Sequence, residues 1–342
     1  MFDTLSRRTL TAAAALAFVA GCSGNPASLA PGQSSAMAPS ARRAGPGMRV
    51  LRGPAVTGPI VVPLVAHPAN LPHAWPKTRS GQILFVSDAT NNQVLMYDPK
   101  TANPTPLGSI TNGLNVPFGL AIDSHGALYV ANLGNNTITV YPAGASSPSL
   151  TISNGVNGPY GIGVDSKGNV FATNLNDDTV VAFAAGATTP YETIDFTSEG
   201  QGIGLGIDAS DNVWIGSDTT SQVWEIPAGS STPQNAGLSG LDGSTGVSFG
   251  KNGMMYVSNF GGSNVTIYAP GTTSPARTLT SGIETHGPTL SGFASSGRFF
   301  QSNQGLNVVG YKGYKKNQTS PFSTITGNTN PTGIAGSPLI KK

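Results

Sequence analysis

The strongest constraint on the fold is a sequence unit that returns at a nearly fixed interval. The unit is clearest at 117–141, PFGLAIDSHGALYVANLGNNTITVY, and close copies follow at 159–183, 202–226, 244–268 and 288–311, with a partial copy at 83–97. Large apolar residues close these copies, spaced 42–44 residues apart: Tyr97, Tyr141, Phe183, Ile226, Tyr268 and Tyr311. One small sheet cannot bury both of its faces, so a period of this length predicts units that stack on one another.

Each copy reads as three short strands separated by turn residues. In 117–141 we expect strands at 119–122, 128–131 and 138–141, because apolar residues alternate there and Gly, Asn and Asp lie between. A proline follows each third strand, where a short edge strand tolerates a missing N–H: Pro104, Pro148, Pro190, Pro233, Pro275 and Pro321. The pattern predicts an all-β fold, a six-bladed β-propeller with four-stranded blades.

The two ends of the repeat array predict how the ring closes. The first copy lacks an innermost strand, whereas PTGIAGS at 331–337 follows the sixth copy as a spare strand. We expect this C-terminal strand to complete blade one and to remove the open edge of the ring. Truncation before Pro331 is therefore expected to destabilise the whole ring.

The amino terminus has the layout of an export signal. Arg7 and Arg8 precede an apolar run at 10–20, and the segment 19–22, Val-Ala-Gly-Cys, resembles the lipobox of bacterial lipoproteins. That resemblance implies cleavage before Cys22, the only cysteine, and a lipid anchor on it, on the periplasmic face or cell surface. An ordinary cleavage site or a buried thiol is the alternative. The arginine pair also resembles a twin-arginine signal, so the export route stays open.

Composition divides the chain into four segments. After the signal peptide at 1–22 we expect a flexible Ser/Ala/Pro/Gly tether at 23–47, an extended lead-in at 48–80 and the propeller at 81–342. The net charge is +2 and no basic run is interleaved with aromatic residues, so no nucleic-acid partner is expected. We expect a monomer.

The segments GLAIDSHGALYVAN (119–132) and GIGVDSKGNVFATN (161–174) are similar to NHL repeats, and six such blades resemble the gluconolactonase and regucalcin-like propellers. The resemblance implies a metal site at the channel mouth. In the lactonases a divalent metal is held there by a glutamate, an asparagine and the aspartate of a Pro-Asp-Gly turn. The matching turns at 117–119, 159–161 and 331–333 contain no aspartate, and 83–88 contains no glutamate. We therefore expect no cofactor; calcium or another divalent cation belongs to the hydrolase alternative.

Strand one begins and strand two ends at the same end of an antiparallel blade, so their end residues should meet at one mouth of the channel. The candidate ligand-binding residues there are Phe118, Tyr160, Asp88, Asn132, Asn174, Asp242, Asn259, His286 and Asn303. They suit a small polar ligand or a protein partner. Asparagine and aspartate at strand ends also bond nearby backbone to make turns, and the recurrence in nearly every blade favours that interpretation. The two aromatic residues can equally pack the channel.

No catalytic residue is assigned. The sequence contains no Gly-x-Ser-x-Gly elbow, phosphate-binding loop or His-Glu-x-x-His helix. His286 and Glu284 are the one carboxylate–imidazole pair expected at the mouth, as acid–base groups or simply as loop residues. The leading hypothesis is a lipid-anchored extracytoplasmic binding module without catalysis. The alternatives are a metal-dependent lactonase-like hydrolase and a structural cell-envelope protein.

Overall fold

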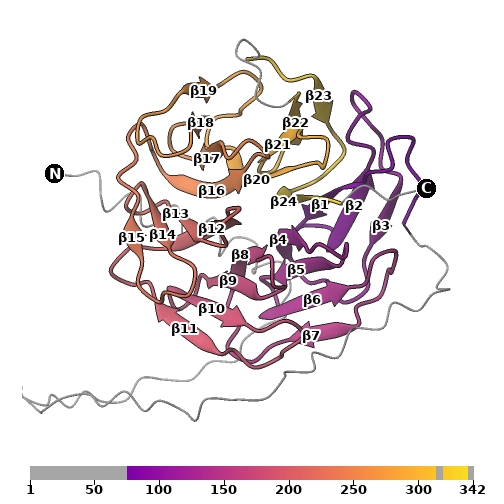
Figure 1. The fold of residues 1–342 in the computed structure, drawn as a ribbon. Helices are drawn as coiled ribbons and strands as arrows, with labels where there is room; N and C mark the ends of the chain where they lie inside the picture. Colours follow the sequence, from indigo (N-terminus) through magenta and orange to yellow (C-terminus); the bar gives the residue numbers. More distant parts are fainter. Residues whose placement is uncertain (1–74, 313–318, 338–342) are drawn as a thin grey trace, which may run out of the picture. The chain divides into compact units, whose positions relative to one another are not determined.

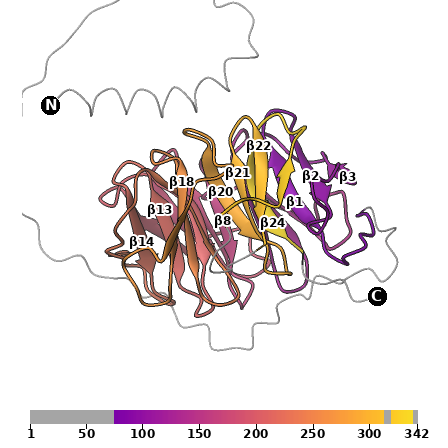
Figure 2. The ribbon, with the colours of Figure 1, turned by 90° about the horizontal axis from the view of Figure 1, so that it is seen from above.

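The computed structural model describes residues 75–312 and 319–337. These residues form six four-stranded antiparallel sheets arranged as the blades of a ring, which confirms the predicted all-β six-bladed propeller (Figure 1). The strands of every blade run between the same two faces of the ring (Figure 2). Within this part of the chain, no helix is long and apolar enough to cross a membrane.

The strands follow the predicted period. Blade one contains β24 (Pro331–Gly336), β1 (Leu84–Asp88), β2 (Gln93–Tyr97) and β3 (Gly108–Ile110). Blade two contains β4 (Pro117–Ile122), β5 (Leu128–Asn132), β6 (Thr137–Tyr141) and β7 (Leu150–Ile152), and blade three β8 (Pro159–Val164), β9 (Val170–Asn174), β10 (Thr179–Phe183) and β11 (Glu192–Asp195). Blade four contains β12 (Gly202–Ile207), β13 (Val213–Ser217), β14 (Gln222–Ile226) and β15 (Gln234–Asn235). Blade five contains β16 (Ser244–Phe249), β17 (Met255–Asn259), β18 (Asn264–Tyr268) and β19 (Arg277–Leu279), and blade six β20 (Pro288–Phe293), β21 (Phe299–Asn303), β22 (Asn307–Tyr311) and β23 (Ser323–Ile325).

The C-terminal strand closes the ring as predicted. β24 pairs antiparallel with β1, with Leu84 opposite Gly336, and lies beside β1 at the junction with blade six (Figure 1). The fully buried carboxylate of Asp88 strengthens this closure by accepting hydrogen bonds from the backbone N–H groups of Thr329 (3.1 Å) and Asn330 (3.2 Å). Burial opposes the charge of Asp88, but these hydrogen bonds and those from Asn91 prevail and hold its pKa below the ordinary value.

The tyrosines that mark the period in blades one, two, five and six tie those four blades to the loop that enters each of them. The hydroxyl of Tyr141 donates to the carbonyl of Asn112 at 2.7 Å, and that of Tyr268 donates to the carbonyl of Ser239 at 2.7 Å. In blade six, Tyr311 donates to the carbonyl of Ser281 at 2.6 Å, and in blade one Tyr97 donates to the side-chain oxygen Oδ1 of Asn328 at 2.8 Å. Each buried hydroxyl thus has a hydrogen-bond partner. The tyrosines that recur in the sequence therefore make a recurring contact that anchors a loop.

The innermost strands approach one another so closely that glycine is required. An added Cβ on Gly119 would collide with the carbonyl of Tyr160, and one on Gly333 with that of Phe118. Five blades have glycine at the third position of the inner strand: Gly119, Gly161, Gly204, Gly246 and Gly333. Blade six has Leu290 there instead.

The end of the expected lead-in lies on the ring. The indole N–H of Trp75 donates to the carbonyl of Ala145 at 2.7 Å, and its ring packs edge-on against Phe85 at a centroid distance of 4.8 Å. Trp75 is 6% exposed and so joins the core between blades one and two. The lead-in up to residue 74, the predicted signal at 1–22 with Cys22, and the tether at 23–47 lie outside the described residues.

Candidate functional site

The channel has two ends, and the predicted residues gather at one of them. In blade two, Pro117 pairs with Asn132 at this end, whereas Ile122 pairs with Leu128 at the other. The inner strands begin and the second strands end at the Pro117 end, which we call the mouth. The opposite end, where the inner strands finish, is called the lower end.

The predicted asparagines are buried at the mouth and hold the loops that link the blades. Their side-chain Oδ1 atoms accept hydrogen bonds from backbone N–H groups near the start of the same blade. Asn132 binds Asn115 (3.1 Å), Asn174 binds Asn157 (3.0 Å), Asn259 binds Asp242 (3.3 Å) and Asn303 binds Glu284 (3.3 Å). All four asparagines are at most 2% exposed. Each asparagine side chain therefore clamps a backbone N–H group that lies 17–19 residues earlier in the sequence.

Phe118 and Tyr160 form a plug across the channel just inside the mouth. Their rings pack at a centroid distance of 4.4 Å, and they share a cluster with Ile203, Leu290 and Ala89, which we call the mouth plug. Both aromatic residues are less than a tenth exposed, so neighbouring side chains cover the faces of their rings. Burial and the nearby charge of Asp218 raise the pKa of Tyr160.

His286 and Asp242 are the exposed members of the predicted set. The ring of His286 lies against Phe260 at a centroid distance of 5.6 Å, and its backbone N–H donates to Ser263 Oγ at 3.0 Å. The backbone of His286 has φ +51, a left-handed conformation that is uncommon for residues other than glycine. The imidazole is thus held on a constrained loop that faces solvent.

Asp218 is a mouth residue that the sequence interpretation missed. It follows β13 directly, and its Oδ1 is buried without a hydrogen-bond partner. Burial raises the pKa of this carboxyl to about 6, against the smaller opposing effect of a hydrogen bond from the N–H of Thr219. An unpartnered buried oxygen is costly, and such groups gather at sites where a ligand or reaction uses them.

Comparison of the six blades at the position of Asp218 shows what makes it different. The residues that follow the second strands are Ala89, Leu133, Leu175, Asp218, Phe260 and Gln304. The first three pack on the mouth plug, so blades one to three give an apolar half of the mouth. Blades four to six give a polar and aromatic half. Blade four also carries Ser217 in place of the clamping asparagine, so it departs from the repeat at two adjacent positions.

The donor set at the mouth does not form a metal centre in the described part of the chain. No group of three or more His, Cys, Asp or Glu side chains there is arranged to hold an ion. The carboxylate of Asp88 is engaged by Thr329, Asn330 and Asn91. The divalent cation of the hydrolase alternative stays a prediction.

The solved structures most informative for comparison are other propellers. A chain in the crystal structure of a nidogen/laminin complex is 14% identical with a TM-score of 0.64, covering 75% of this chain and 99% of that one. A streptogramin B lyase is 15% identical with a TM-score of 0.56, covering 74% and 83%. A catalytically inactive histidine-to-alanine variant of the virginiamycin B lyase from Staphylococcus aureus, solved with quinupristin, is 11% identical with a TM-score of 0.53, covering 75% and 89%.

These likenesses concern the fold alone. The chain has the six-bladed β-propeller fold that its repeats predict. No family model matches it, and the search of curated proteins finds no significant match.

Proposed function

We propose that this chain is a lipid-anchored extracytoplasmic propeller that binds a small polar ligand at the polar half of its mouth, without catalysis. Asp218 carries the proposal, because its Oδ1 is buried and unpartnered, and it stands where three other blades have apolar residues that belong to or pack on the mouth plug. A ligand hydroxyl or ammonium group would supply the missing hydrogen bond. Phe260 and His286 supply a ring pair on the same half of the mouth.

The test measures the melting temperature of the full chain in the presence of polyols, sugars and primary amines. The wild type and Asp218→Leu are measured side by side. Leucine is the matched replacement, since Leu133 and Leu175 occupy the equivalent positions. The proposal expects a ligand that raises the melting temperature of the wild type with increasing concentration and leaves that of Asp218→Leu unchanged. A ligand that stabilises both proteins equally, or no ligand at all, would contradict it.

A second candidate function is an enzyme that uses His286 as a general acid or base. The observation that favours it is the exposed imidazole on a constrained loop two residues after Glu284, whose backbone is clamped by Asn303. Imidazole is suited to proton transfer near neutral pH. One of the similar propellers is a lyase whose variant lacking one histidine is described as catalytically inactive.

Activity separates the two candidates. The full chain would be incubated with a panel of lactones and cyclic depsipeptides, with and without calcium, zinc and a chelator. Turnover that is lost in His286→Ala, while the melting temperature is kept, would establish the enzyme and replace the binding proposal. Turnover unchanged in His286→Ala would come from another source and count against this second candidate.

The lipid anchor is tested independently of the mouth. Cells that express the full chain would be given a radiolabelled fatty acid, with Cys22→Ser as the matched variant. The proposal expects label and membrane fractionation in the wild type only. An unlabelled wild-type chain, or label in both proteins, would contradict the anchor at Cys22.

A further inference from the structure

Blade six departs from the other blades at two adjacent positions of its inner strand. The third position is glycine in five blades and Leu290 in blade six. The fourth position is aliphatic in those same blades and serine in blade six: Leu120, Ile162, Leu205, Val247, Ile334 and Ser291. The large side chain of blade six is therefore displaced by one residue toward the mouth.

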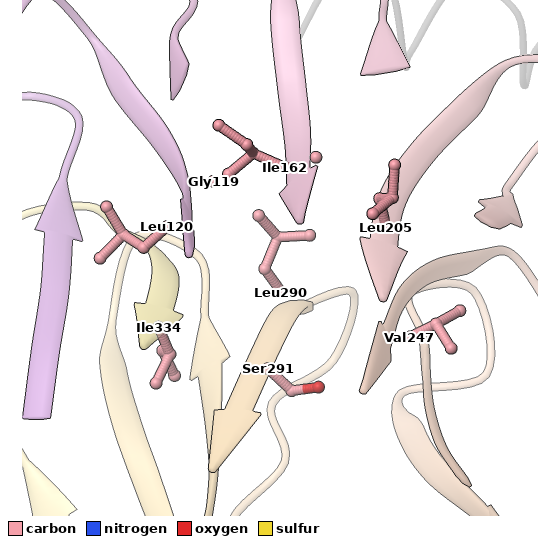
Figure 3. A pocket seen from close by; sticks show the side chains of 9 residues that line it. Gly119, Leu120, Ile162, Leu205, Val247, Leu290, Ser291 and Ile334 are labelled. Carbon is pink, nitrogen blue, oxygen red and sulfur yellow. The ribbon is translucent and has the colours of Figure 1, made fainter. Parts of the chain in front are cut away.

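This exchange has two consequences along the channel. Leu290 joins the mouth plug and lies among Leu120, Ile162 and Leu205 at the channel axis (Figure 3). Only a void of ≈ 20 Å³ is left beside it, which is room for about one water molecule. The plug thus separates the mouth from the lower end. Ser291, in turn, leaves space below Leu290 that an aliphatic side chain fills in the other blades.

The space below forms an open cavity of ≈ 200 Å³ at the lower end. Its walls are residues from the second half of the inner strands. The large apolar ones at the rim are Ile122, Val164, Ile207, Phe249 and Phe293, all half-buried, and polar atoms make up most of the remaining accessible lining. A cavity of about 150 Å³ lined by apolar side chains accepts benzene in another protein. The lower cavity therefore has room for one aromatic ring with a substituent, and its two phenylalanines offer edge or face contacts to it.

The polar side chains of the lower cavity lie together on one wall. Ser248 Oγ and Ser291 Oγ lie 2.9 Å apart and share one hydrogen bond, and both residues line the cavity. One hydroxyl of such a pair donates its hydrogen to the other. The second hydroxyl hydrogen and several lone pairs then stay available to a ligand. Asp, Glu, Lys, Arg and His are absent from the residues that line this cavity.

We propose that the lower cavity is a second binding site that takes a small neutral aromatic molecule with one hydroxyl group, of the phenol class. The apolar side chains, with Phe249 and Phe293 among them, would hold the ring, and the Ser248–Ser291 pair would exchange hydrogen bonds with the hydroxyl. A charged ligand is disfavoured because no opposite charge would offset its desolvation. Because Leu290 closes the channel above, this site is independent of the mouth.

The test is a fluorine NMR titration of the full chain with 4-fluorophenol, fluorobenzene and 4-fluorobenzoate. The proposal expects saturable binding of 4-fluorophenol with a dissociation constant on the order of 1 mM or lower. Fluorobenzene should bind roughly fivefold to tenfold more weakly, since it lacks the hydrogen bonds. No saturable binding is expected for 4-fluorobenzoate. Equal binding of the three probes, or none, would overturn the proposal.

Two variants place the site. Ser291→Leu restores the aliphatic residue of the other blades, fills the cavity and should weaken 4-fluorophenol binding at least tenfold. Ser248→Ala should reduce the affinity for 4-fluorophenol to that for fluorobenzene and leave fluorobenzene unchanged; it decides the question if Ser291→Leu fails to fold. Asp218→Leu, at the mouth, should change neither probe. Binding unaffected by both serine substitutions would overturn the proposal.

Discussion

The two ends of the channel are built from the same six strands and differ in how their residues are held. At the mouth, side chains bind loops far along the chain, as Asn132 binds Asn115. At the lower end, the turns are held mainly by their own residues: the carboxylate of Asp123 accepts from the N–H groups of His125 (2.9 Å) and Ala127 (2.8 Å). One link between blades is added there, because Asp211 accepts from the N–H of Ser166 at 2.8 Å. The mouth is clamped and plugged, whereas the lower end is open and lined by apolar side chains, backbone groups and the Ser248–Ser291 pair.

This difference shows that the sequence repeat determines the arrangement of the blades. Residues that depart from the repeat in one blade determine which polar groups and cavities lie at each end of the channel. Asp218 introduces a carboxyl with one unpartnered oxygen, Oδ1, into one half of the mouth. The pair Leu290 and Ser291 closes the channel and opens the lower cavity. Each departure lies in one blade only, so neither end of the channel keeps the sixfold symmetry of the ring.

The largest expected effect comes from removing β24, which lines the channel from mouth to lower end. A chain that stops at residue 330 leaves β1 with an unpaired inner edge and should lose cooperative unfolding. A chain that lacks only residues 338–342 is the control and should unfold like the wild type. Circular dichroism during heating measures both. A cooperative transition in the longer truncation would contradict closure by β24.

Leu290→Gly should break the separation between the two ends. It restores the glycine of the other blades but removes a buried side chain from the mouth plug, so we expect a loss of about 2–5 kcal/mol in the free energy of unfolding. Leu306→Ala is the control, because Leu306 is 54% exposed and should matter little. Urea unfolding measures both. A loss in Leu290→Gly no larger than that in the control would show that Leu290 is no plug.

Asp88 tests the clamps of the mouth. Asp88→Ala leaves the N–H groups of Thr329 and Asn330 without partners and should cost about 2–4 kcal/mol in unfolding free energy. Asp88→Asn should recover only part of this loss, because its one amide oxygen can accept from one of the two N–H groups, which bind different oxygens of Asp88.

The stabilisation by Asp88 should also depend on pH. Its pKa is lowered in the folded state, so its contribution is complete above the ordinary value of 3.8 and is lost as the pH falls through the folded value. Urea unfolding of the wild type and Asp88→Asn, measured down to pH 2, checks this. The wild type should lose more stability in acid than Asp88→Asn, and parallel pH profiles would contradict the clamp.

Asp218→Leu should have the smallest effect, and the opposite sign. The pKa of Asp218 is raised from 3.8 to about 6 in the folded state, so the wild type loses stability as the pH rises between these values. We expect the variant to be more stable than the wild type by about 1–3 kcal/mol at pH 8 and by almost nothing at pH 4. Urea unfolding at the two pH values measures it. A variant less stable at pH 8 would contradict an unpartnered carboxylate.

Most of the frame could be predicted from the sequence, because it rests on local patterns. The 42–44-residue spacing of the closing residues, such as Tyr141 and Tyr268, predicts six blades, and the spare strand at 331–337 predicts closure. The strands expected at 128–131 and 138–141 correspond to β5 and β6 within one residue. Periodic burial and turn chemistry are enough for this level of structure.

The site could be predicted only in part, because the surroundings of its residues depend on contacts with residues that are distant in the sequence. Register shifts near the start of the inner strands, as between Pro117 and Leu120, send Phe118 into the plug. Whether an asparagine faces a ligand or a loop depends on a partner about 17 residues away. Asp218 lies one position beyond the ring that was predicted. Aligning the six copies at that position would have found it.

The most direct test of two independent sites is one ligand-observed NMR screen of a single library of neutral phenols, polyols and small amines. The full wild-type chain, Asp218→Leu and Ser291→Leu would be screened side by side. Our account predicts that polyol or amine ligands are lost only in Asp218→Leu and that phenols are lost only in Ser291→Leu. Loss of the same ligands in both variants, or of none in either, would contradict it.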